Sequence, residues 1–375
     1  MPARHPCETP STPTDVERGA FRVRFSTVHP RELGTPELAR WQALRAAGTL
    51  PRNPFLSAEF AVAVGAARPD TRVTMIDDAA TTVGFFAHER HGRVARPVGT
   101  LLADSEGPVL APGVTVDMAA LLAHEGLAGW DFDTLADGLL PAGAYRVDAE
   151  RSPVLDLSPG WDDYLATISA RSKKWLASTW RKRRKLEREV GEIRFEFNTD
   201  DAKVLTRLME WKSGQYAALG EWDRFADPAI VSIAQTLAAS QAPECTGAVS
   251  ALWAGDQLVA AHLGLHSDTV LSWWFPAYDA EFGRYSPGIL LLLAIAEAAA
   301  GRGITQLDLG RGAHDYKEAT ATGELVVRTG SLDAASLSSL PRRAKRVVRA
   351  GLAPLARDEG PVGRTLRSVK ARVRA

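Results

Sequence analysis

The side chains that could do acid–base chemistry lie between residues 262 and 317. Asp308 lies in the predicted strand 304–309, and its alternation with Leu307 and Leu309 places its carboxylate on the opposite face of that strand. At the carboxyl end of a strand, such a group could orient or deprotonate an amine or a hydroxyl. Lys317 follows on a loop, where its ammonium could offset phosphate or oxyanion charge. A surface ion pair of Asp308 with Lys317 or Arg311 is the competing interpretation.

His262 is a second candidate base. It lies in VAAHLGL, a strand otherwise free of polar residues, on the face opposite to Ala261 and Leu263. An imidazole that titrates near neutral pH suits general-base catalysis. A hydrogen-bonded core histidine is the alternative.

The segment 285–289 has the pattern of a ligand-binding helix start. Ser286 is predicted to be the N-cap, Pro287 suits the first helical position, and Gly288 would let a ligand approach the backbone. The N–H groups of Gly288, Ile289 and the next residue are then expected to be unpaired and to attract a phosphate, with Tyr285 beside them. Gly310 and Arg311, after the following strand, are expected at the same ligand. A plain helix start would have the same pattern.

The elements that position these residues form a definite order. The runs 248–253, 257–266 and 269–275, separated by short turns, predict an antiparallel meander. An apolar helix over 287–300 and a strand over 304–309 complete a βαβ crossover, and 325–332 supplies one more strand. Upstream, Ser158 and Pro159 predict the start of a long amphipathic helix, and helices are expected over 204–216 and 228–240. The first half alternates strands (21–25, 72–76, 82–88, 130–135) with helices (37–46, 116–124).

The charge balance is zero overall but uneven along the chain. Residues 171–188 carry nine Lys and Arg against Glu187 alone, and residues 342–375 carry eleven against two acidic residues. Five of the helical cations are expected near a phosphate: Lys173, Lys174, Arg181, Arg184 and Lys185. The tail has the apolar spacing of two short basic helices, which would suit an anionic membrane surface or dock on the acidic body.

Composition narrows the class of protein. Cys7 and Cys245 are too few for a disulfide framework or a zinc site, and no secretory signal or bilayer-spanning run occurs, so we expect a cytoplasmic protein. The composition is that of a globular protein, and the length favours two domains. Hydrolase, nucleotide-loop and metalloprotease motifs are absent from the sequence.

The element order and its decorating residues resemble the GNAT acyltransferase superfamily. Within it, the chain is most similar to the BcsL/CelD-type acetyltransferases, relatives of the Fem-type aminoacyl transferases. The resemblance rests on PAYDAEFGRYSPG (276–288), GITQLDLGRGAHDYK (303–317) and LWAGDQLVAAHLGL (252–265), with NPFLSAEF (53–60) and GTLLADSEGPVLAPG (99–113) in the first half. It implies an α/β (α+β) fold of two tandem GNAT-like domains with mixed sheets flanked by helices. The expected divisions are a disordered leader (1–18), a degenerate domain (19–150), an acyltransferase domain (151–335) and a basic tail (336–375).

The function that this resemblance implies is transfer of an acyl group, typically acetyl, from a thioester to an amine or hydroxyl acceptor. Acyl-CoA would be the co-substrate, no metal is implied, and the acceptor would be a small molecule or glycan of polysaccharide or cell-envelope metabolism. Residues 283–288 depart from the usual phosphate-loop pattern, Gln/Arg-x-x-Gly-x-Gly/Ala, which weakens the assignment of acyl-CoA. Two alternatives stay open: a Fem-like transferase that uses aminoacyl-tRNA, and a non-catalytic scaffold that binds a membrane or polymer through the tail, peripheral to the inner membrane face.

Overall fold

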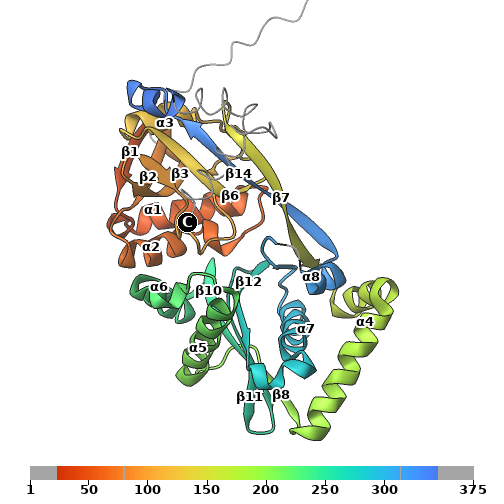
Figure 1. Cartoon of the computed structure of the whole chain (residues 1–375). Coiled ribbons are helices and arrows are strands. Elements are labelled where there is room, and N and C mark those ends of the chain that lie inside the picture. The colour runs from red at the N-terminus through yellow and green to blue at the C-terminus, as the bar shows by residue number, and fades with distance from the viewer. Residues whose placement is uncertain (1–22, 79–80, 313, 345–375) are drawn as a thin grey trace, which may run out of the picture.

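The structure is a computed structural model of the 375-residue chain and describes residues 23–78, 81–312 and 314–344. The expected leader (1–18) and the tail beyond residue 344 lie outside the described residues. Strands and helices alternate along the chain, and the strands join into one mixed sheet with helices packed against it (Figure 1). The fold class expected from the sequence is thereby confirmed. None of the described helices is long and apolar enough to cross a bilayer.

The first three strands of the chain pair in antiparallel order. β2 and β3 form a hairpin, and β1 pairs with β2 at the edge of the sheet. The helices α1 and α2 pack beside these strands, where Trp41 of α1 stacks on Phe85 of β3 with ring centroids 4.7 Å apart. The elements of this half are β1 (Val23–Val28), α1 (Thr35–Ala47), α2 (Ala58–Ala67), β2 (Thr71–Asp78), β3 (Thr81–His91), β4 (Val94–Arg96), β5 (Val109–Leu110), α3 (Met118–His124) and β6 (Gly129–Ala136).

The second half contains the predicted meander and crossover. β10, β11 and β12 pair in antiparallel order, and β12, α7 and β13 form the βαβ unit with β12 parallel to β13. Its elements are β7 (Tyr145–Asp156), α4 (Trp161–Glu189), β8 (Ile193–Glu196), α5 (Ala202–Leu219), α6 (Pro228–Ala238), β9 (Gln241–Ala242), β10 (Cys245–Ala254), β11 (Gln257–His266), β12 (Val270–Tyr278), α7 (Pro287–Ala300), β13 (Gln306–Asp308), α8 (Asp315–Thr320) and β14 (Gly323–Asp333). Short 3-10 turns precede α2 (η2, Pro54–Leu56) and α7 (η4, Ala280–Tyr285).

Two local expectations were wrong. The long helix α4 begins at Trp161, not at Pro159, because Gly160 takes a positive φ of 97° and serves as its N-cap. The Ser158 hydroxyl instead donates to Asp156 Oδ1 at 2.6 Å in the preceding turn. Ser286 does occupy the N-cap of α7, but with φ 54° and ψ 53° its side chain caps no backbone group. An N-cap side chain reaches the next turn from an extended backbone, which Ser286 lacks.

The two halves share strands and core. β14 lies between β6 and β7 in the sheet, so the last strand of the chain pairs with a strand of the first half. The boundary expected at residue 150 falls inside β7. One buried cluster also joins the halves, with Phe55 of η2 in edge contact with Trp274 of β12 at 5.8 Å between ring centroids. This contact holds the segment before α2 against the carboxyl end of β13.

Candidate active site

The splay between β12 and β13 creates the opening in the sheet. The two strands pair only from Val270 to Ser272, opposite Gln306 to Asp308, whereas β12 runs on to Tyr278. Beyond Asp308 the chain turns away through Gly310, which has a φ of 69°. Beyond Ser272, β12 is therefore no longer paired with β13, although it stays paired with β11.

Asp308 is buried at this opening and is held by groups from distant parts of the chain. Its Oδ1 accepts hydrogen bonds from Ser152 Oγ at 2.8 Å and from the Gly310 N–H at 2.9 Å. Its Oδ2 accepts from Asn53 Nδ2 at 3.3 Å. Burial raises the pKa of Asp308 from its ordinary value, although the Gly310 and Ser152 hydrogen bonds and the nearby Lys317 charge oppose that rise. Both carboxylate oxygens are occupied, so Asp308 is built to position its neighbours.

Lys317 lies in the short helix α8 and not on a loop as the sequence predicted, and it contacts the loop that follows Asp308. It is only 5% exposed, and its Nζ donates to the carbonyl oxygens of Gly310 at 2.9 Å and Arg311 at 2.8 Å. Burial lowers the pKa of Lys317, while the carboxylates of Asp104 and Asp308 oppose that shift. The structure therefore brings Asp308 and Lys317 into one electrostatic cluster, as the sequence predicted.

Asp104 is the member of the cluster that sequence reasoning missed. It comes from the loop before β5, is half-buried, and a Cβ on Gly310 would lie 3.2 Å from its Oδ2. Burial, together with the Asp308 charge, raises the pKa of Asp104 from 3.8 to about 7, although the Lys317 charge lowers it. A carboxyl group that titrates near neutral pH can accept a proton from a reacting group. Asp104 lies within the family-like stretch 99–113, and its position between small residues was the only available signal.

A small cavity of about 80 Å³ lies in front of these carboxylates. Asp104, Asp308 and Asn53 line it, together with Leu50, Pro51, Leu56 and part of β14. Its volume accommodates a group of a few heavy atoms, such as an amine or a hydroxymethyl group. The cluster thus offers a proton acceptor next to a space where an acceptor group fits.

The helix start at 285–289 forms a second part of the site. Lys182 of α4 donates to Ser286 Oγ at 2.7 Å, and the Tyr285 hydroxyl donates to Glu189 at 2.7 Å and accepts from Arg284. The expected outward N–H groups are fewer than predicted, because the N–H groups of Ile289 and Leu290 donate to the Ser286 carbonyl. Among the described residues, the Gly288 N–H donates to no backbone carbonyl, and a Cβ at this position would lie 3.4 Å from the Tyr278 ring.

His262 does not join the carboxylates, and Arg311 acts on them only through its charge, which lowers the pKa of Asp104. The His262 ring stacks on Trp273 at 4.4 Å between centroids, and burial lowers its pKa to about 3. Because Ser272 pairs with Asp308 and neighbouring residues of a strand face opposite ways, Trp273 and His262 lie on the other face of the sheet. The Arg311 guanidinium binds both oxygens of Asp133, at 2.7 and 2.6 Å, and this pairing raises its pKa. Its side chain is therefore directed to the first half of the chain.

The comparisons with known proteins agree with this architecture. Residues 173–318 match the family model described as an acetyltransferase (GNAT) domain. The fold is similar to the crystal structure of FemX, with a TM-score of 0.55 at 10% identity over 81% of this chain and 96% of that chain. It is also similar to the C-terminal domain of a protein described as a lysylphosphatidylglycerol synthetase from Agrobacterium fabrum, with a TM-score of 0.52 at 14% identity over 83% and 96% of the two chains. No curated protein sequence matches the chain.

These findings concern the second half of the chain. Residues 173–318 match the model of a GNAT acetyltransferase domain, and at these identities the solved structures establish a common fold and nothing finer. Within the part of the chain that the structure describes, no cluster of three or more histidine, cysteine or acidic side chains is arranged to hold a metal ion.

Proposed function

We propose that the protein transfers an acyl group, typically acetyl, from a thioester to an amine or hydroxyl acceptor. The observation that carries this proposal is Asp104, a carboxyl group with a pKa of about 7, facing the small cavity beside Asp308 and Lys317. It lies where β12 and β13 separate, next to the family-matching segment. Acyl-CoA is the proposed donor, and the BcsL/CelD-type resemblance is its finer assignment.

In this mechanism Asp104 accepts the proton of the acceptor as its nitrogen or oxygen attacks the thioester carbonyl. Asp308 holds Ser152, Asn53 and the Gly310 N–H in place around the cavity. Lys317 lowers the pKa of Asp104, so that its carboxylate is populated near neutral pH. A base contributes most when its pKa lies close to the working pH.

The donor phosphates are proposed to bind at Ser286, Pro287 and Gly288. Lys182 already approaches the Ser286 hydroxyl, and Arg284 and Lys185 lie over the Tyr285 ring at 4.6 and 5.9 Å from its centroid. A phosphate at this position would meet the Gly288 N–H, the helix dipole and the Lys182 ammonium. Glu189 is the acidic residue nearest to this cluster through its bond with Tyr285.

The test begins with binding and then measures turnover. A panel of acyl-CoAs is added to the full-length protein, and thermal shift identifies the donor. Release of the free thiol then reports transfer to candidate amines and alcohols. Asp308→Asn and Lys317→Ala should each lower kcat/KM by about a hundredfold, within the range for general acid–base catalysis. Asp315→Asn, an exposed carboxylate in α8, serves as the matched control. Near wild-type turnover in both variants would contradict the proposed site.

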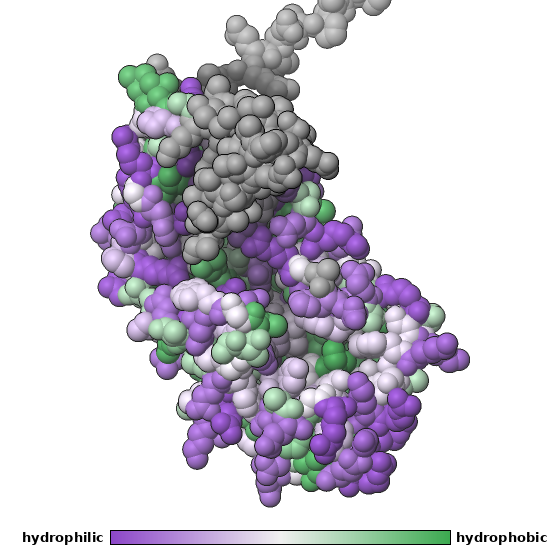
Figure 2. Space-filling model, in the orientation of Figure 1, coloured by the Kyte–Doolittle hydropathy of each residue, from purple (hydrophilic) through white to green (hydrophobic). Residues whose placement is uncertain are grey.

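An aminoacyl-tRNA donor is the second candidate, favoured by the charge of α4. Its cations Lys173, Lys174, Arg181, Arg184 and Lys185 are all exposed, and Figure 2 shows hydrophilic residues gathered where Figure 1 places this helix. Replacing Lys173, Arg181 and Arg184 with Glu should strongly weaken the binding of tRNA and reduce the dependence of that binding on salt concentration. Unchanged donor kinetics in this variant, at both low and high salt, would exclude the polyanionic donor.

A further inference from the structure

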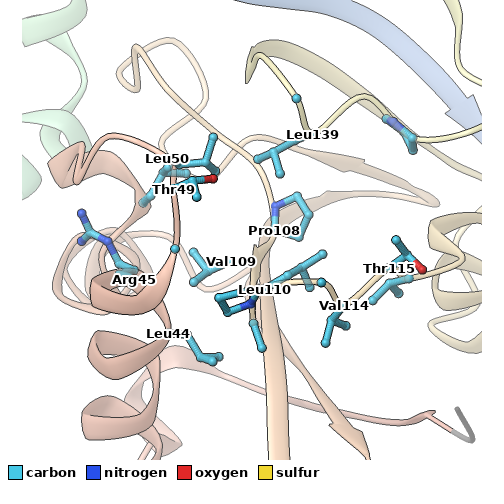
Figure 3. A pocket seen from close by; sticks show the side chains of 18 of the residues that line it. Leu44, Arg45, Thr49, Leu50, Pro108, Val109, Leu110, Val114, Thr115 and Leu139 are labelled. Carbon is cyan, nitrogen blue, oxygen red and sulfur yellow. The ribbon is translucent and has the colours of Figure 1, made fainter.

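A large cavity in the first half of the chain is not used by the mechanism above. Its volume is about 570 Å³, within the range of about 300–1,000 Å³ that ligand pockets occupy. Three segments wall it: the end of α1 with residues 48–52, residues 108–116 around β5, and residues 138–142 after β6. Figure 3 shows Leu50, Pro108 and Leu139 approaching one another from these segments. A pocket of this volume that opens to solvent has room for a small-molecule ligand.

The wall of this cavity is apolar and carries little net charge. Of the residues that the structure describes, Arg45 and Arg52 are the charged ones that line it. Arg45 Nη1 lies 3.1 Å from buried Glu244, and Arg52 forms ion pairs with Glu244 and with Asp268, the latter at 2.5 Å. Two guanidinium groups thus face two carboxylates. Such a wall favours an apolar ligand over a phosphate or a polyanion.

The large cavity adjoins the small one in front of the carboxylates. Leu50, Pro51 and Leu56 line both. A molecule that fills the large cavity therefore has its end next to the space that Asp104 and Asp308 face. This arrangement separates a site for binding from a site for reaction.

We propose that the acceptor carries its amine or hydroxyl on an apolar body, and that this body binds in the large cavity. The inference rests on the proposed function for the identity of the reacting group. The acceptor nitrogen or oxygen enters the small cavity and forms the new bond to the acyl carbon. The carbon–sulfur bond of the donor breaks, the acceptor proton passes to Asp104, and the thiolate leaves with the sulfur electron pair.

The test measures binding to the full-length protein without donor. Two probe series, the n-alkylamines and the n-alkanols from butyl to decyl, are titrated by calorimetry. Affinity should rise about fourfold for each added methylene, the factor expected for moving one CH₂ out of water. Ala111→Trp, which places an indole in the cavity wall, should lower the affinity for the longer probes at least tenfold. Ala46→Trp, exposed on α1 outside the cavity, is the matched control and should bind like the wild type.

A second variant guards against misfolding of the first. Val114→Asp introduces a carboxylate at the half-buried wall and should weaken the long probes selectively. Affinity without chain-length dependence, or wild-type affinity in both folded variants, would overturn the inference. Efficient transfer to small hydrophilic acceptors alone would overturn it while leaving the proposed function intact. Chain-length-dependent binding without transfer from any thioester or aminoacyl donor would instead contradict the proposed function.

Discussion

Asp104 shows how the surroundings of a residue set its chemistry. An aspartate in water is ionised far below neutral pH, but burial and the charge of Asp308 raise the pKa of Asp104 to about 7. Lys317 limits that rise because its ammonium is attracted to the ionised form. The three side chains therefore form one coupled unit, and changing one of them alters the proton affinity of the others.

The pH–rate profile tests the role of Asp104. With a pKa of about 7 in the free enzyme, kcat/KM should rise as pH increases through 7 and then level off. Asp104→Asn should lower kcat/KM by about a hundredfold and remove this rise. A variant with the same pH dependence as the wild type would show that another group accepts the proton.

The same shift predicts a change in stability with pH. The folded pKa of Asp104 lies above its ordinary value of 3.8, so the folded protein binds more protons than the unfolded chain between these values. The stabilising contribution of Asp104 is therefore present below pH 3.8 and is lost as pH rises through about 7. Asp104→Asn should raise Tm relative to the wild type at pH 8 and leave it nearly unchanged at low pH. Thermal denaturation across pH measures this difference, and a lower Tm of the variant at pH 8 would contradict it.

At the scale of elements, α4 and α7 together form the proposed donor site. The amino end of α7 faces the second half of α4, where Lys182 contacts Ser286. Lys173, Lys174, Arg181 and Arg184 are exposed on the same helix, whereas Lys185 lies over the Tyr285 ring. The helix thus offers Lys182 and Lys185 to the α7 start and further cations to solvent.

This arrangement separates two variants of α4. Lys182→Ala should weaken acyl-CoA binding by about tenfold, as expected for one hydrogen bond to a charged group. Lys173→Ala, an exposed cation on the same helix, is the matched control and should bind acyl-CoA normally. Calorimetric titration gives both affinities. Equal loss in the two variants would indicate a diffuse charge effect in place of a specific contact.

Gly288→Val examines the helix start directly. A Cβ at this position reaches Tyr278 at 3.4 Å, and the added methyl groups would occupy the space in front of the first helical N–H groups. Donor KM should rise by at least tenfold, while affinity for the acceptor stays unchanged. Gly301→Ala at the other end of α7, where a Cβ meets only helix carbonyls at 3.6 and 3.7 Å, is the control. Unchanged donor KM in Gly288→Val would place the donor elsewhere.

At the scale of the whole molecule, the last strand of the chain pairs with a strand of the first half. β14 pairs with β6 through residues 327–333 and with β7 through residues 323–331. The described start of the basic tail also contacts the first half, because Arg342 forms ion pairs with Asp131 of β6 and Asp333 of β14. The two halves therefore depend on each other for their strand ladders and for their common core.

This interdependence predicts a single unfolding transition. Calorimetric and van't Hoff enthalpies should agree, because neither half keeps a complete sheet without the other. Gly330→Ala in β14 should lower the free energy of unfolding by about 1–3 kcal/mol, since its Cβ would lie 2.6 Å from the Phe132 ring. Gly214→Ala, in an open position of α5, should instead be neutral or slightly stabilising. Two separate unfolding transitions in the wild type would contradict the inference that the pairing of β14 with β6 stabilises both halves together.

Local pattern was sufficient for the meander and the crossover of the second half, but not for β7 or α8. The meander and the α7 crossover were predicted because strand alternation, turn residues and the Ser-Pro-Gly start act over a few neighbouring residues. Asp308 and Lys317 were predicted as a pair for the same reason, since only one loop separates them. The local backbone conformation could not be predicted in the same way. Ser286 has the residue type of an N-cap, yet its backbone lies in the left-handed region.

Only the tertiary structure decided which residues complete the site. Two side chains bind Asp308 from far along the chain: Ser152, 156 residues away, and Asn53, 255 residues away. Asp104 comes from a separate loop and lies against Gly310. Ser152 approaches because its strand β7 pairs with β13, a long-range pairing that no periodicity encodes. The face of His262 was likewise decided by strand register, which placed it with Trp273 and away from the carboxylates. Sequence determines which side chains are available and on which element, whereas long-range pairing determines which of them share a desolvated space and hence a shifted pKa.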